Sequence, residues 1–283
     1  MSQFPKAYTP PVVKRPEQFR RQLRELPAFR ALLRAVEADF YVDLPMPAPV
    51  LDLGCGDGHF ADIAFDERLD VGLDPWWAPL QEAKERDQHR WLTHADGAAM
   101  PLPSGRFGTI VSNSVLEHIP DVNPVLAEVS RVLKPGGWFH FAVPGPNFRR
   151  YLLGARLLEA LGLQGPAATY RALFDRISRH YYYLSPEGWA ARLEQVGLQL
   201  VRWWSYFSPG ALRALELGHP LGLPSLLAKK LTGRWLVAPT SWNLVVTEMV
   251  LRRFYEEPVS KGSAGAYLFL SAQTECDHSR GPK

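Results

Sequence analysis

Apolar residues recur every three or four positions between residues 16 and 40, which predicts a helix with one apolar face. Pro27 interrupts this pattern, and we expect a kink or break there because a proline removes a backbone hydrogen bond from a helix. Residues 1–15 lack the pattern and are expected to form a flexible arm. The stretch "LPMPAP" at residues 44–49 separates this region from the rest of the chain.

Short apolar runs then alternate with helical patterns, which is the order of βαβ units on a parallel sheet. Asn123 is expected to cap one of the helices, which ends at Gly136-Gly137, and Ser185 to cap another, which ends at Gly197. A strand is expected after that second helix. The other predicted strands are residues 50–53, 70–74, 90–95, 108–113, 138–144 and 265–273.

The loop "DLGCGDG", residues 52–58, follows the first predicted strand. In open α/β sheets ligands bind at the carboxyl ends of strands, where the strand order reverses. Gly54, Gly56 and Gly58 can adopt backbone angles closed to other residues and let the main chain approach a ligand. The next helix points its free N–H groups at the same place. The alternative is a tight strand-to-helix turn without a ligand.

The spacing of this loop argues against two nucleotide-binding motifs. The dinucleotide fingerprint needs glycine at the sixth position from Gly54, where this chain has His59, and no Gly-Lys-Ser/Thr of a P-loop follows. Asp74 ends the second predicted strand and could accept hydrogen bonds from both hydroxyls of a ribose. Asp96 ends the third and could bind an exocyclic adenine amine. Together they favour an adenosine-containing ligand.

Four stretches in order resemble the motifs of class I S-adenosylmethionine-dependent methyltransferases: "VLDLGCGDGHF", "VGLDPW", "ADGAAMPLPSGRFGTIVSNSVLEHI" and "EVSRVLKPGGWFHFAVP". The resemblance covers residues 48–146 and is strongest to the branch that acts on small molecules and quinone or lipid precursors. It implies an α/β, Rossmann-like sheet of seven strands, mostly parallel, in the order 3-2-1-4-5-7-6 with helices on both faces. The chain departs from the family at Phe107-Gly108, where members usually have Phe-Asp.

The resemblance implies S-adenosylmethionine as cofactor and gives roles to the motif residues. Asp52 would bind its amino group, the glycine loop would approach its methionine part, and Asp74 would hold its ribose. Pro75 and Trp76 would lie beside the adenine, the segment after the third strand would hold its edge, and the end of the fourth strand would floor the methyl-transfer site. The implied cofactor-binding residues are Asp52, Gly54, Cys55, Gly56, Gly58, Asp74, Pro75, Trp76, Asp96, Gly97, Ala98, Asn113 and Ser114.

Direct in-line methyl transfer to an oxygen acceptor requires a base, whereas a soft carbon or amine acceptor does not always need one. His118, after the fourth strand, and His180 are the candidate catalytic residues, although each could instead be structural. Tyr181–Tyr183 are expected to form pocket wall. We predict no metal site, because Glu117 and His118 are neighbours that point apart on a helix and the sequence shows no third ligand.

The predicted domain organisation is an N-terminal arm and helix (1–45), a methyltransferase domain (46–273) and a flexible tail (274–283). Helical insertions at residues 145–184 and 208–263 should emerge on the acceptor side. Both are rich in Leu, Trp and Tyr, so they are expected to form an apolar cap over a small hydrophobic acceptor. They could instead pack on each other, form a homodimer contact, or touch a membrane surface through apolar runs beside paired basic residues.

The composition excludes several other classes. A net charge of +3 without a basic tract argues against a nucleic-acid partner. The two cysteines make neither a disulfide framework nor a zinc motif, and no leader or bilayer-spanning apolar run is visible, so a cytoplasmic location is expected. The alternatives to a small-molecule methyltransferase are a cofactor-binding or regulatory protein without turnover, and a protein or RNA methyltransferase. The Asn/Asp-Pro-Pro-aromatic signature of many nucleic-acid methylators is absent from "SNSVLEHIP".

Overall fold

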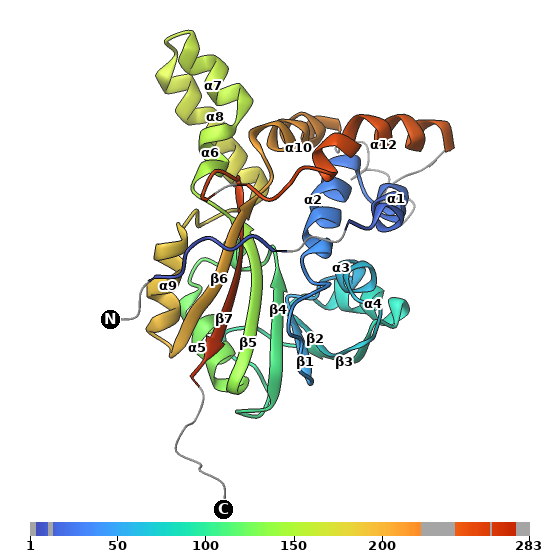
Figure 1. The fold of residues 1–283 in the computed structure, drawn as a ribbon, viewed down its shortest axis with the longest axis vertical. Helices are drawn as coiled ribbons and strands as arrows, with labels where there is room; N and C mark the ends of the chain where they lie inside the picture. Colours follow the sequence, from blue (N-terminus) through green and yellow to red (C-terminus); the bar gives the residue numbers. More distant parts are fainter. Residues whose placement is uncertain (1–3, 11–13, 222–240, 261, 276–283) are drawn as a thin grey trace, which may run out of the picture.

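The computed structural model describes residues 4–10, 14–221, 241–260 and 262–275 (Figure 1). A seven-stranded sheet has the order β3-β2-β1-β4-β5-β7-β6, as predicted. All neighbouring strands are parallel except that β7 is antiparallel to both β5 and β6. The strands are β1 (Val50–Leu53), β2 (Leu69–Asp74), β3 (His89–His94), β4 (Phe107–Asn113), β5 (Leu133–Pro144), β6 (Leu198–Tyr206) and β7 (Tyr267–Thr274).

Helices cover both faces of this sheet. Residues of α5 and α9 pack on one face, and residues of α1, α2, α3 and α10 pack on the other. The helices are α1 (Pro16–Glu25), α2 (Ala28–Asp39), α3 (His59–Ala64), α4 (Trp77–Arg86), the 3-10 helix η1 (Leu116–His118), α5 (Asn123–Val132), α6 (Asn147–Tyr151), α7 (Leu153–Ala160), α8 (Gln164–Ser178), α9 (Pro186–Glu194), α10 (Pro209–Leu221) and α12 (Ser241–Tyr255).

Strand β7 shows how the sequence builds two cores. Successive side chains of a strand point to opposite faces of its sheet. Leu268 and Leu270 accordingly pack with the α5 and α9 side, while Tyr267 and Phe269 pack with the α2 side. The ring of Phe269 stacks on Trp204 of β6 with centroids 4.5 Å apart. The first four residues of β7, all apolar, are therefore buried on both faces of the sheet.

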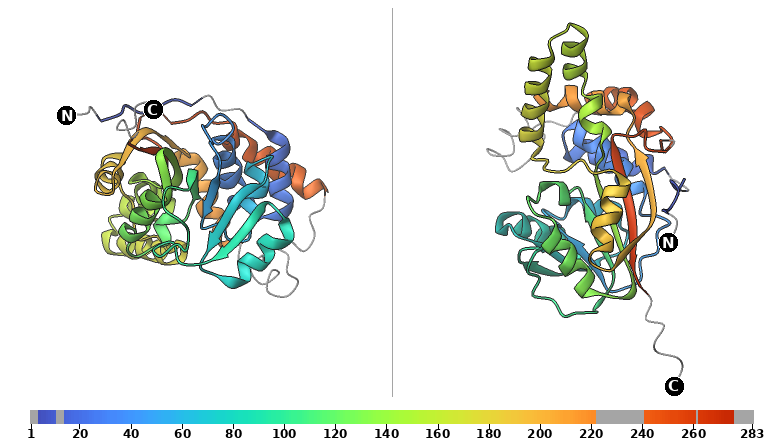
Figure 2. Two further views of the ribbon diagram at one scale, coloured as in Figure 1. Left: turned by 90° about the horizontal axis from the view of Figure 1, so that it is seen from below. Right: turned by 90° about the vertical axis from the view of Figure 1, so that its left-hand side faces the viewer.

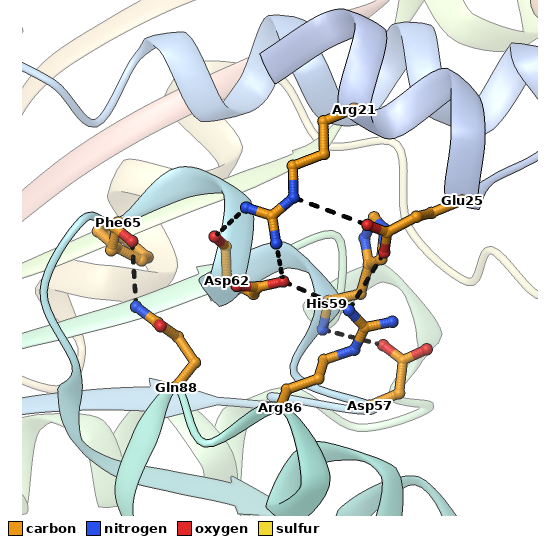
Figure 3. A network of polar contacts seen from close by, with 8 residues as sticks. All are labelled: Arg21, Glu25, Asp57, His59, Asp62, Phe65, Arg86 and Gln88. Carbon is orange, nitrogen blue, oxygen red and sulfur yellow. Dashed lines mark hydrogen bonds and ion pairs between the residues drawn. The ribbon is translucent and has the colours of Figure 1, made fainter. Parts of the chain in front are cut away.

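The predicted break at Pro27 is confirmed, because α1 ends at Glu25 and α2 begins at Ala28. A polar network holds α1 against the helices that follow β1 and β2 (Figure 3). Arg21 Nη2 lies 2.6 Å from Asp62 Oδ2 of α3, and Arg86 Nη1 of α4 lies 3.2 Å from Glu25 Oε2. Hydrogen bonding to His59, with help from Arg86, lowers the pKa of Glu25 to about 2. The N-terminal helices are thus fastened beside the glycine loop.

Several local predictions differ from the structure. Residues 4–10, expected in a flexible arm, run along β6, where Tyr8 N donates to Trp203 O and Trp203 Nε1 donates to Pro5 O, each at 2.8 Å. Asn123 is not a cap but the first residue of α5, and its N–H donates to Asp121 Oδ1 at 3.1 Å. That helix also ends early, at Val132, because the next residues already pair in β5.

The predicted cap at Ser185 is confirmed, since its Oγ accepts a hydrogen bond from Gly188 N at 3.2 Å. The first insertion contains three helices, α6, α7 and α8. Helices α6 and α7 are separated at Leu152, whose φ of −55° and ψ of 118° are not helical. Helices α7 and α8 form a hairpin that projects beyond the sheet in Figure 1 and in the right view of Figure 2.

Helices α6, α10 and α12 lie at the end of the sheet where β5 and β6 finish (Figure 1). Parts of the second insertion and of the predicted tail (222–240 and 276–283), with Lys229-Lys230 and Cys276, lie outside the described residues. Within the described part of the chain, no helix has the length and apolar character needed to cross a bilayer. The domain boundaries, the cytoplasmic location and the dimer or membrane contacts remain predictions.

Candidate functional site

The glycine loop faces free space at Gly56 but packs against another segment at Gly54. Gly54, Gly56 and Gly58 have φ angles of +77°, +54° and +71°, in the left-handed region that favours glycine. A Cβ atom on Gly54 would lie 2.5 Å from a methyl group of Val115, so the loop is packed against the segment after β4. A Cβ on Gly56 would meet nothing within 4 Å. The backbone of Gly56 therefore faces free space.

The carboxylate of Asp74 ties β2 to this loop. Its Oδ2 accepts a hydrogen bond from Gly56 N and its Oδ1 one from Trp76 N, each at 2.9 Å. Burial raises the pKa of Asp74, and the two amide hydrogen bonds oppose that rise. Each carboxylate oxygen has a second lone pair, so both hydroxyls of a ribose can still donate to Asp74.

Exposed groups lie at the ends of β2 and β3. Trp76 is 68% exposed although its indole is large and apolar. Asp96 is exposed, and its Oδ1 accepts a hydrogen bond from Ala98 N at 2.8 Å. Pro75 O lies 3.0 Å from His94 Nε2, and Gly97 packs on Leu53. Asp74, with acceptor capacity left for a ribose, the free space at Gly56, and the exposed groups Trp76 and Asp96 form an arrangement into which S-adenosylmethionine could fit. The roles of these residues toward the cofactor stay predictions.

Other predicted cofactor residues are engaged within the protein. Asp52 Oδ2 lies 2.9 Å from His89 Nε2 in a buried pair. Burial raises the pKa of the Cys55 thiol, which keeps it protonated. Asn113 Nδ2 and Ser114 Oγ donate to the Glu37 carboxylate at 2.6 and 3.3 Å. The roles assigned to these residues toward the cofactor stay predictions.

Gly56→Ala is expected to weaken cofactor binding by about tenfold, equivalent to about 1.4 kcal/mol, because the added methyl group occupies the free space over the loop. Gly105→Ala is the matched control, since Gly105 has φ +62°, also meets nothing within 4 Å and lies in the loop before β4. Both changes carry the same backbone cost of about 1–2 kcal/mol. Calorimetric titration with S-adenosylmethionine distinguishes them. If both variants bind S-adenosylmethionine with the same affinity, the predicted approach of the cofactor to the backbone of Gly56 would be contradicted.

A cavity of about 590 Å³ lies beside the loop, between α2, η1 and the first insertion. We call it the α2–η1 cavity. Its walls include the apolar side chains of Phe29, Leu33, Phe148, Ile177 and Leu215. Its polar lining includes Arg30, Arg34, Ser114, Glu117, His118, Arg179, His180 and His219. The cavity is thus apolar on its walls and rich in hydrogen-bonding groups elsewhere.

The segment after α8 is held against η1, and this brings the two predicted catalytic histidines together. Tyr181 N donates to Glu117 O at 2.8 Å, and His118 Nδ1 lies 3.1 Å from Arg179 O. Tyr182 donates its hydroxyl hydrogen to Pro120 O. The rings of His118 and His180 consequently have centroids 5.4 Å apart. Both line the α2–η1 cavity.

Burial sets the protonation of this group. It lowers the pKa of His118 and lowers that of His180 to about 3, so both imidazoles are neutral near pH 7. Burial raises the pKa of Glu117 to about 8. Glu117 Oε2 is buried without a hydrogen-bond partner among the described residues. The sequence shows no third ligand beside Glu117 and His118, but the structure brings His180 near them, with donor atoms of the three residues within 4.8 Å of one another. The prediction of no metal site stays a prediction.

The sequence did not predict a role for three residues of α2. Arg30 and Arg34 line the cavity, and Arg34 Nη1 lies 2.9 Å from Glu37 Oε2. Glu37 is fully buried and also accepts a hydrogen bond from Tyr206 Oη at 2.7 Å. The spacing of Arg30, Arg34 and Glu37 along one face of an otherwise apolar helix is the signal that could have indicated them.

Known proteins are similar to the part of this chain that contains the glycine loop and the acids at the ends of β2 and β3. Residues 51–141 match the family described as Methyltransferase domain. A probable S-adenosylmethionine-dependent methyltransferase of Mycolicibacterium smegmatis is 35% identical over 130 residues, which cover 41% of this chain and 51% of that protein. The chain therefore spans about half the length of this relative.

Two further proteins extend the similarity. The 2-phytyl-1,4-naphtoquinone methyltransferase of Thermosynechococcus vestitus is 29% identical over 195 residues, 63% of this chain and 84% of that protein. The crystal structure of a possible histamine N-methyltransferase from Thermotoga maritima has a TM-score of 0.53 at 15% identity, covering 88% of this chain and 91% of that one. At that identity it shows the fold alone. The strand order and the match of residues 51–141 together place a methyltransferase domain with the class I fold in this part of the chain.

Proposed function

We propose that this protein transfers a methyl group from S-adenosylmethionine to a small-molecule acceptor bound in the α2–η1 cavity. The observation that carries the proposal is the close packing of Gly54 against Val115, because it brings the cofactor loop next to the segment after β4 that contributes to the cavity lining. Ser114 and Glu117, on either side of Val115, line the cavity. Similarity to a naphtoquinone methyltransferase supports an acceptor of small-molecule size.

The bound cofactor supplies a methyl group activated by a positively charged sulfur. The protein contributes by holding the cofactor and the acceptor in position. Asp74 and the loop at Gly56 fix the cofactor, and the cavity fixes the acceptor on the other side of Val115. Such orientation of two reactants can lower a barrier by about 7 kcal/mol or more. The apolar walls around Phe29 and Phe148 keep water from the reacting atoms.

We propose an acceptor with an apolar body and a polar reacting end. The apolar walls suit the body, and the neutral imidazoles of His118 and His180 suit a hydroxyl or another group that must lose a proton. His118 Nδ1 faces the carbonyl oxygen of Arg179, which fixes the tautomer and leaves a lone pair on Nε2. Either histidine is placed to accept the acceptor's proton.

Incubation of the protein with methyl-labelled S-adenosylmethionine and a metabolite extract tests the proposal. A labelled small molecule, identified by mass spectrometry, is the expected product. Asp74→Ala should abolish its formation at low cofactor concentration. Cofactor binding without any labelled product would favour a regulatory protein, and label on protein or RNA would favour the third class of function.

A further inference from the structure

Glu117, His118 and His180 offer three ligands of two types that zinc prefers, carboxylate oxygen and imidazole nitrogen. Catalytic zinc sites commonly use three protein ligands, such as two histidines and a glutamate, and leave a fourth position for water or substrate. In this chain the three donor atoms lie within 4.8 Å of one another on the wall of the α2–η1 cavity. We propose that these residues bind a zinc ion whose open position faces the acceptor.

The carboxylate of Glu117 provides evidence independent of the cluster. Its side chain is 1% exposed, and its Oε2 has no hydrogen-bond partner among the described residues. A buried polar atom without a partner costs about 1–3 kcal/mol, so native proteins rarely retain one without a reason. Glu117 also lines the cavity, so a ligand entering there can reach it. A metal ion would satisfy this oxygen.

The second nitrogen of each histidine is already engaged, as it is in most metal-binding histidines. His118 Nδ1 lies 3.1 Å from Arg179 O. His180 Nδ1 lies 3.2 Å from Tyr183 Oη, which donates its own hydrogen to Asp175 Oδ1 at 2.6 Å. Tyr183 must then accept from His180. Both Nε2 atoms therefore carry the lone pair that a metal requires.

The distances need only a small contraction. With bonds of about 2.1 Å, ligand atoms of a tetrahedral zinc site lie about 3.4 Å apart. His118 Nε2 already lies 3.9 Å from Glu117 Oε1. The hydrogen bond from Tyr181 N to Glu117 O holds the two chain segments in place. Rotation of the side chains can close the remaining gap without moving the backbone.

The charges around the cluster limit the affinity. Arg30, Arg34 and Arg179 also line the cavity and oppose a cation. The charge of Arg34 is balanced by Glu37 at 2.9 Å, and ionised Glu117 contributes one negative charge to the metal. We therefore expect micromolar rather than nanomolar binding of zinc.

The inference rests on the proposed function for the role of the metal and not for its binding. A hydroxyl bound to zinc has a lowered pKa and loses its proton more readily. With zinc present, the Nε2 atoms of His118 and His180 would hold the metal and could not act as bases. The acceptor's hydroxyl would then release its proton to water when it binds the metal. The acceptor's oxygen would also be fixed in position.

Titration of the metal-free full chain with Co²⁺ and Zn²⁺ tests the site. We expect one equivalent to bind, with the visible absorption bands of four- or five-coordinate cobalt. Glu117→Gln and His180→Gln should each weaken Zn²⁺ binding by about tenfold or more, because second-shell changes alone cost about 10–100-fold. His219→Gln, on the same cavity but outside the cluster, should leave the metal affinity unchanged. S-adenosylmethionine affinity, measured in parallel, verifies that each variant is folded.

Cobalt that keeps the spectrum of the hexa-aqua ion, or equal zinc affinities in all variants, would overturn the metal site. Labelled product formed at full rate in the presence of a chelator would overturn the role of the metal in the reaction while leaving the proposed methyl transfer intact. Metal binding that depends on Glu117 and His180, without any methylated product, would support the site and count against the proposed function. The two failures are thus distinguishable.

Discussion

Replacing Asp74 by alanine is expected to reduce the affinity for S-adenosylmethionine by about tenfold to a hundredfold. The change removes the carboxylate that can accept from both ribose hydroxyls, and hydrogen bonds to a charged group contribute about 1.5–3 kcal/mol. It also leaves Gly56 N and Trp76 N without their acceptor, so the loop itself is less well fixed. Isothermal titration calorimetry of the cofactor and of its demethylated product measures the loss.

Two variants separate the ribose contact from general damage. Asp74→Asn keeps the size of the side chain and one acceptor oxygen, so its affinity should lie between those of the alanine variant and the unchanged protein. Asp66→Ala removes an exposed carboxylate before β2 and should bind the cofactor normally. Unchanged affinity in Asp74→Ala, with an unchanged unfolding temperature, would refute the assignment of Asp74 to the ribose.

The fold was largely predictable because its signals are local. Runs of four to eight apolar residues marked the strands, and Pro27 marked the end of α1. The resemblance of ordered motifs supplied the strand order, which periodicity alone does not give. The errors lie where a long-range contact decides the structure. Tyr8 N donates a hydrogen bond to Trp203 O of β6, and the sequence around these two residues contains no pattern that predicts the contact.

The candidate site also has a part that the sequence could predict and a part that it could not. The residues expected at the cofactor lie in short motifs at strand ends, so their proximity follows from the topology. The α2–η1 cavity is assembled from α2, η1 and the first insertion, which are far apart in sequence. His118 and His180 were both singled out, but their approach depends on the contact between Tyr181 and Glu117. The approach of His180 to Glu117 and His118 has no sequence signal, so the sequence could not indicate this group of three side chains.

Glu37 shows how strongly the predicted methyl-transfer floor and the α2–η1 cavity depend on α2. Its Oε1 accepts hydrogen bonds from Tyr206 Oη and Ser114 Oγ, and its Oε2 from Arg34 Nη1 and Asn113 Nδ2. One buried carboxylate thus joins β6, the end of β4 and the cavity wall. The N-terminal helix, which the sequence separated from the methyltransferase domain, supplies the anchor for the predicted floor of the methyl-transfer site.

Glu37→Leu is therefore expected to lower the free energy of unfolding by about 3–5 kcal/mol, because removing one partner of a buried ion pair leaves the other charge uncompensated. Arg34, whose side chain is 19% exposed, would lose its carboxylate partner, and Asn113, Ser114 and Tyr206 would lose their acceptor. Urea unfolding at constant m-value measures the change.

Glu37→Gln keeps the shape and part of the hydrogen bonding, so its loss should be smaller but still above about 1 kcal/mol, the typical cost of a missing buried partner. Glu85→Gln makes the same chemical change at an exposed position of α4 and should stay within about 0.5 kcal/mol of the unchanged protein. If Glu37→Leu unfolds at the same urea concentration as Glu85→Gln, the network around Glu37 does not stabilise the fold. The link between α2 and β4 would then rest mainly on the apolar cluster that buried residues of α2 share with Val111 of β4.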